Sequence, residues 1–103
     1  MPRPQFIEKA ITALLSGQGA TQISLRRGVF ELLRSGNGEA PAGLAVLMEK
    51  ISDRPWMVSD VDISRAVEAG YSEDQIYELV LAAAAGAGVR RLDAGLRALE
   101  EAE

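Results

Sequence analysis

A group of carboxylates near the middle of the chain is the first candidate for chemistry. Four of them flank Trp56, the only tryptophan: Glu49, Asp53, Asp60 and Asp62. Two carboxyl groups can share general acid and base roles when burial separates their pKa values. The same residues also suit a solvated face with helix caps, which we favour because charged groups are rarely buried. Asp60-Val61-Asp62 lacks the glycine turn and closing glutamate of a calcium loop, so we expect no metal site.

Two adjacent arginines near the C-terminal end are the second candidate. Arg90 and Arg91 with Asp93 could hold a small anionic ligand through bidentate hydrogen bonds. An ion pair between helices or subunits is the commoner use of such residues, and we favour it. Trp56 is read either as a packing residue at a helix junction, the preferred interpretation, or as a ligand platform. Trp56, Arg90 and Arg91 are therefore the candidate ligand-binding residues, and no catalytic residue is assigned.

The chain contains no cysteine and no histidine. Thiol peroxidase chemistry is excluded, because it needs a thiolate. Serine nucleophiles have no histidine base, so a Ser–His mechanism is excluded as well. We expect no cofactor, and an enzymatic role is not favoured.

Composition indicates one globular domain over residues 1–103. Hydrophobic residues make up 48% of the chain and charged residues 25%. The net charge of −4 disfavours nucleic acid and anionic membrane surfaces as partners, since both attract basic proteins. The longest uncharged stretch, residues 79–89, is shorter than the roughly 20 residues that span a bilayer. We therefore expect a cytoplasmic protein without nucleic-acid or membrane partners.

Apolar residues recur with a helical period throughout, and no segment alternates like a strand. About five helices are predicted, which makes the fold class all-α. The first begins at Pro4 and stops at residues 17–19; the second is capped by Thr21 or Ser24 and stops at residues 35–38; the third begins at Pro41. Trp56 and Pro55 lie beyond the third helix.

The fourth and fifth helices start with the same pattern. Ser59 and Ser72 each occupy a cap position, with Asp62 and Gln75 three residues later, which is the spacing of a capping box. We expect helices at residues 60–69 and 73–102, the second about 45 Å long. Residues 79–87 are apolar on all sides, so they must be enclosed by other helices or by a second subunit. The long helix is therefore expected in a homo-oligomer interface.

One segment resembles a known family. Val58-Ser59-Asp60-Val61-Asp62-Ile63, Ala66-Val67-Glu68-Ala69-Gly70-Tyr71-Ser72-Glu73-Asp74 and the alanine-rich helix ending in Arg90-Arg91-Leu92-Asp93 are similar to the C-terminal half of the alkylhydroperoxidase D-like, or carboxymuconolactone decarboxylase-like, family. The resemblance covers residues 58–99; the first half matches only as generic helices. It implies an all-α fold and assembly into oligomers of intertwined helices.

The family's peroxidase members use a Cys-x-x-Cys pair, a histidine and a glutamate. Neither cysteine nor histidine is present here, so no catalytic residue carries over. The first hypothesis is a non-catalytic, thiol-free relative, a small oligomeric binding or structural protein. The alternative is a thiol-independent lyase or isomerase that uses carboxylates and arginine on a small carboxylated substrate.

Overall fold

The computed structural model describes residues 2–102, and these form five α-helices and one 3-10 turn, with no strand among them. The helices are α1 (Gln5–Ser16), α2 (Ile23–Ser35), α3 (Ala45–Asp53), α4 (Asp60–Glu68) and α5 (Glu73–Ala102), and the turn η1 (Pro55–Met57) follows α3. The all-α prediction is confirmed. None of the described helices is long and apolar enough to cross a membrane.

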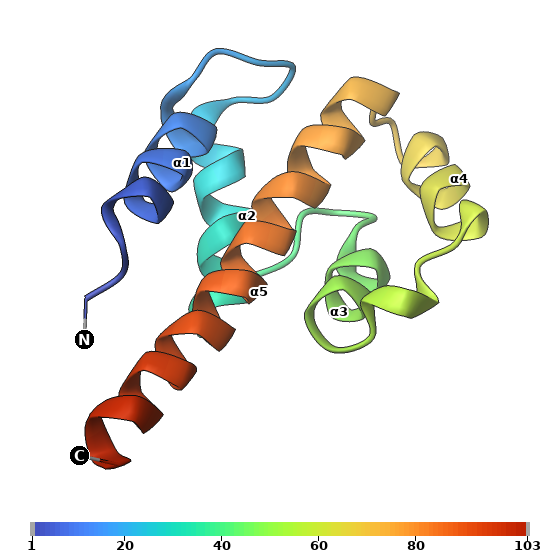
Figure 1. Cartoon of the computed structure of the whole chain (residues 1–103). Helices are drawn as coiled ribbons and strands as arrows, with labels where there is room; N and C mark the ends of the chain where they lie inside the picture. The colour runs from blue at the N-terminus through green and yellow to red at the C-terminus, as the bar shows by residue number, and fades with distance from the viewer. Residues whose placement is uncertain (1, 103) are drawn as a thin grey trace.

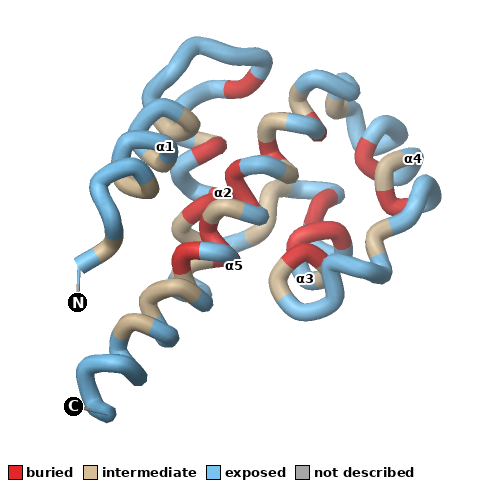
Figure 2. The backbone as a smooth tube through the Cα atoms, viewed as in Figure 1, coloured by how far each residue is buried: buried red, intermediate tan, exposed pale blue. Residues whose placement is uncertain are grey.

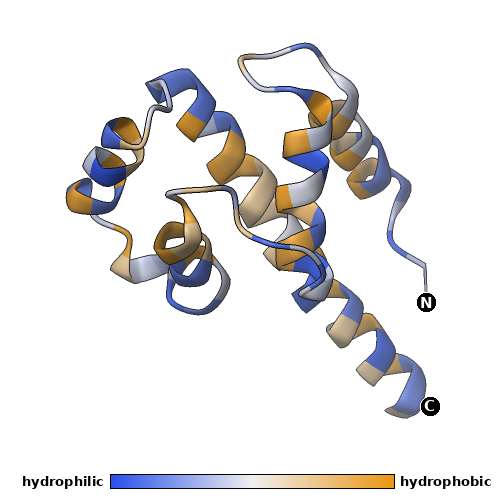
Figure 3. Cartoon of the chain, turned by 180° about the vertical axis from the view of Figure 1, so that it is seen from behind, coloured by the Kyte–Doolittle hydropathy of each residue, from blue (hydrophilic) through white to orange (hydrophobic). Residues whose placement is uncertain are grey.

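The long helix α5 is the axis of the molecule (Figure 1). It has 30 residues, and the molecule measures 50 × 29 × 21 Å, so the longest dimension approaches the length of this one helix. α2 makes the most extensive contact with α5, and α3, α4 and α1 make smaller ones. Seen from behind, α2 and the connection from α2 to α3 cover that side of α5 (Figure 3).

The core lies where α2, α3 and α5 meet, as the buried segments in Figure 2 show. The buried face of α5 is built mainly of small residues, which lets α2 approach closely. It comprises Ile76, Leu79, Ala82, Ala83, Gly86, Ala87 and Val89. Opposite it on α2 lie Val29, Phe30 and Leu33, and α3 contributes Leu47, Met48 and Ile51.

The predicted fourth and fifth helices agree with the structure. Ser59 and Asp62 form a capping box, and Ser72 and Gln75 form a second one, with Ser72 N–H donating to Gln75 Oε1 at 2.9 Å and Gln75 N–H to Ser72 Oγ at 3.1 Å. Gly70 has a φ of 107°, a left-handed conformation that ends α4. The boundary between the two helices follows from local sequence alone.

Two predicted helix starts are wrong. The second helix begins at Ile23 with Gln22 before it and no side-chain cap, because the Thr21 hydroxyl instead donates to Glu78 Oε1 at 2.7 Å. The third begins at Ala45 rather than at Pro41, because Gly43 has a φ of 83° that no α-helix tolerates. A Cβ at Gly43 would come within 2.5 Å of Ala69 Cβ, so glycine also lets this turn approach the end of α4.

The two glycines Gly86 and Gly95 of α5 provide a matched test of helix packing. A Cβ at Gly86 would lie 2.3 Å from the Phe30 carbonyl oxygen, whereas a Cβ at Gly95 would meet nothing within 4 Å. We expect Gly86→Ala to destabilise the fold by about 1–3 kcal/mol through overpacking. Gly95→Ala should instead stabilise it by up to about 1 kcal/mol, because alanine is the better helix former. Denaturant melts of both variants check this; equal effects would mean that α2 does not contact α5 at Gly86.

Candidate functional site

The two arginines predicted to bind a ligand meet at the end of α3. Arg90 donates from Nη1 to Leu33 O at 3.1 Å and to Ser52 Oγ at 3.0 Å, and from Nη2 to Ser52 O at 3.1 Å. Arg91 donates from Nη2 to the same Ser52 carbonyl at 2.6 Å. Leu33 and Ser52 lie in the last turns of α2 and α3, where carbonyls lack partners within the helix. Arg90 therefore joins two helix C-termini to α5.

This geometry also favours the positive charge. A helix C-terminus carries a partial negative charge, and a guanidinium placed there is stabilising. Within the described residues, the hydrogen bonds of Arg90 and Arg91 go to carbonyl and hydroxyl oxygens, and an ion pair between subunits stays a prediction. Asp93 points elsewhere, since its Oδ2 accepts a hydrogen bond from Arg3 Nη1 at 3.0 Å. The three residues do not form one ligand site around a shared space.

Trp56 lies on η1, four residues beyond Ser52, with 76% of its surface exposed. The expectation that it packs at the helix junction is wrong, because Ile51 and Val58 on either side of the turn supply the contacts to the core instead. None of the hydrogen bonds of Arg90 and Arg91 involves Trp56. A small anionic ligand at Trp56, Arg90 and Arg91 stays a prediction, and Arg90 already donates to the Leu33 carbonyl and to Ser52.

The acidic residues around Trp56 are divided among separate partners. Asp62 is 5% exposed and accepts hydrogen bonds from Lys50 Nζ at 2.9 and 3.0 Å and from the Ser59 amide at 2.9 Å. The Lys50 ammonium and the Ser59 amide lower the pKa of Asp62. Glu49 pairs with Arg54 at 2.8 Å. In residues 2–102 no group of three or more histidine, cysteine or acidic side chains is placed to hold a metal ion.

A buried polar cluster that the sequence analysis missed lies between α1, α2 and α5. Arg26 is 4% exposed and donates to the carbonyls of Leu14 at 2.8 Å, Gly17 and, more weakly, Thr21 at 3.4 Å. Its Nε lies 3.5 Å from Glu78 Oε1, close enough for an ion pair but without hydrogen-bond geometry. The signal was present in the sequence: Arg26 precedes Val29, Phe30 and Leu33 by three, four and seven residues, the spacing of the core face.

The Glu78 carboxylate binds the loop between α1 and α2 through hydrogen bonds. It accepts hydrogen bonds from the amides of Ala20 and of Thr21 at 3.1 Å, and from the Thr21 hydroxyl at 2.7 Å. The Ala20 amide and then the Thr21 hydroxyl make the largest contributions that lower the pKa of Glu78. A Cβ at Gly19 would collide with this carboxylate. The cluster fixes a loop; its carboxylate stays charged near neutral pH.

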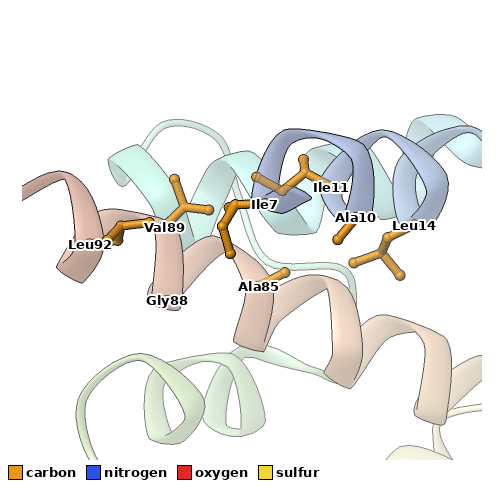
Figure 4. A pocket seen from close by; sticks show the side chains of 8 residues that line it. All are labelled: Ile7, Ala10, Ile11, Leu14, Ala85, Gly88, Val89 and Leu92. Atoms are coloured by element: carbon orange, nitrogen blue, oxygen red, sulfur yellow. The ribbon is translucent and has the colours of Figure 1, made fainter. Parts of the chain in front are cut away.

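A groove lies between α1 and α5 (Figure 4). Its volume is about 380 Å³, and every residue that lines it is apolar: Ile7, Ala10, Ile11, Leu14, Ala85, Gly88, Val89 and Leu92. It has no charged or hydrogen-bonding side chain in its wall, so it can accept apolar groups but offers no group for acid–base chemistry.

Neither protein-family models nor curated proteins nor solved structures give a match to this chain. The resemblance of residues 58–99 to the carboxymuconolactone decarboxylase-like family therefore stays a prediction from the sequence.

The role of Arg90 can be tested by stability. Arg90→Leu should lower the free energy of unfolding by about 1.5–3 kcal/mol, because it leaves the Leu33 carbonyl at the end of α2 without its charged donor and removes one of the two arginines that donate to the Ser52 carbonyl. Arg97→Leu is the control, since Arg97 is exposed on the same helix. A thermal or urea melt is sufficient. If Arg90→Leu is as stable as the parent, the guanidinium does not hold the two helix ends.

The Glu78 carboxylate predicts a pH dependence. Its folded pKa lies below the ordinary value of 4.5, so its contribution to stability is complete above that value and is lost as the pH falls through the folded pKa. Unfolding free energies between pH 3 and 6 should fall less steeply with acid in Glu78→Gln than in the parent. Equal slopes for Glu78→Gln and the parent would contradict this assignment.

Proposed function

We propose that this chain is a non-catalytic helical protein that works by self-association, a thiol-free relative of the carboxymuconolactone decarboxylase-like family with a binding or structural role in the cytoplasm. The support comes from how its polar and apolar groups are used. Arg26, Arg90, Asp62 and Glu78 each hold one part of the fold against another. The groove between α1 and α5 and the neighbouring outer face of α5 are apolar and open.

The observation that carries the proposal is the outer face of α5. Tyr77 is 67% exposed and Leu81 41% exposed on a helix whose opposite face forms the core. Together with the apolar groove beside them, these side chains form the kind of continuous apolar surface that marks an interaction site. A second protein chain is the partner best suited to an elongated surface along one helix.

The alternative function, a thiol-independent lyase or isomerase, would use a carboxyl group kept protonated near neutral pH beside a free guanidinium. The shifts described for Asp62 and Glu78 run in the opposite direction. Arg90, which makes more hydrogen bonds than Arg91, already donates to two carbonyls and a hydroxyl. No observation in the structure favours this alternative.

Self-association is tested by sedimentation equilibrium at micromolar protein concentration. We expect an average mass of at least twice that of the 11.0 kDa chain at the highest concentration. This average mass should fall toward that of the monomer on dilution. A monomer mass at every concentration up to about 100 μM would contradict the proposal. It would mean that the binding free energy is weaker than about 5–6 kcal/mol.

A further inference from the structure

One face of α5 is exposed over residues 74–91 and borders the groove beside α1 at Gly88. Asp74, Tyr77, Leu81, Ala84, Gly88 and Arg91 are all exposed, and they follow one another at intervals of three and four residues. This spacing places them in one line along the helix. α5 crosses the near side of the molecule in Figure 1 with nothing in front of it, and Figure 3 shows that the covered side is the opposite one.

Gly88 is the unexplained residue of this line. Glycine is a poor helix former, and at Gly86 it is required because α2 packs there. At Gly88 a Cβ would meet nothing within 4 Å. Contacts within the chain thus give no reason for a glycine in the middle of a 30-residue helix. A bulky group from outside the chain would give one.

We propose that α5 pairs antiparallel with α5 of a second copy, about a two-fold axis between residues 82 and 83. This inference rests on the proposed self-association and adds its geometry. In that register Tyr77 of each copy lies against Gly88 of the other, and Leu81 lies against Ala84. Each large side chain therefore faces a small one, which is the complementarity that close helix packing needs. A two-fold axis makes every contact occur twice.

The charges agree with the same register. Asp74 lies in the first turn of α5 and Arg91 lies 17 residues further on. Antiparallel pairing brings each Asp74 against Arg91 of the other copy, whereas parallel pairing would place like charges together. Arg91 uses Nη2 for its bond to Ser52 O, and a guanidinium has five N–H donors, so others remain for a carboxylate.

A charge exchange tests the register. Asp74→Arg alone and Arg91→Asp alone should each raise the dimer dissociation constant by at least about tenfold, because each places like charges in contact twice. The double variant Asp74→Arg/Arg91→Asp should restore most of the lost affinity. Arg97→Asp is the control for a charge change on α5, because at about 100° per residue it points roughly 120° away from Arg91. Sedimentation equilibrium gives the constants, and circular dichroism confirms that each variant is helical.

Failure of the register is distinct from failure of self-association. A parent protein that stays monomeric overturns both proposals. A parent that associates while the double variant is no tighter than either single variant overturns the antiparallel register and leaves self-association standing.

The glycine gives a second and independent test. Gly88→Leu should weaken the dimer at least about tenfold by colliding with Tyr77 of the second copy. Its fold should be kept, since a Cβ there meets nothing in its own chain. Gly95→Leu is the matched control: it is also exposed with nothing within 4 Å, and it lies outside the paired residues 74–91. A Gly88→Leu variant that dimerises as tightly as the parent would overturn the proposal.

Discussion

The close approach of α2 to α5 at Gly86 is the contact on which the other helix positions depend. The Phe30 carbonyl and the Leu33 side chain occupy the space that any larger residue at Gly86 would need. This brings the C-terminal end of α2 within reach of Arg90, one turn further along α5. The same guanidinium also donates hydrogen bonds to Ser52 in the last turn of α3. The close approach of two backbones at Gly86 thus helps to fix the relative positions of α2, α3 and α5.

Arginines from neighbouring helices add hydrogen bonds at the C-terminal ends of α1, α2 and α3. α1 has no basic residue in its last turn, and its final carbonyls accept hydrogen bonds from Arg26 and Arg27 of α2. Arg90 does the same for α2 and α3 from α5. Such long-range caps satisfy orphan carbonyls and place positive charge at the negative ends of the helix dipoles. They also explain why residues that look suited to an anionic ligand serve the fold.

The division of α5 into two faces connects the fold with the proposed function. The inner face carries the small residues that α2 requires. The outer face carries the exposed side chains of Tyr77 and Leu81, together with Gly88, where a Cβ would meet nothing within 4 Å. A helix about as long as the molecule itself is well suited to serve one core on one side and a second chain on the other. The apolar groove beside α1 extends the same surface.

The sequence alone predicts the helix ends that are fixed by interactions between neighbouring residues. Ser59, Ser72 and Gly70 fix the start and end of α4 and α5, because capping boxes and left-handed glycines act within a few residues. Tertiary structure decided the rest. The Thr21 hydroxyl donates to Glu78, 57 residues away, instead of capping α2. Trp56 is exposed and does not pack at the helix junction as expected. Contacts between residues so distant along the chain leave no periodic pattern in the sequence. Only the folded structure therefore shows which charged groups stabilise the fold.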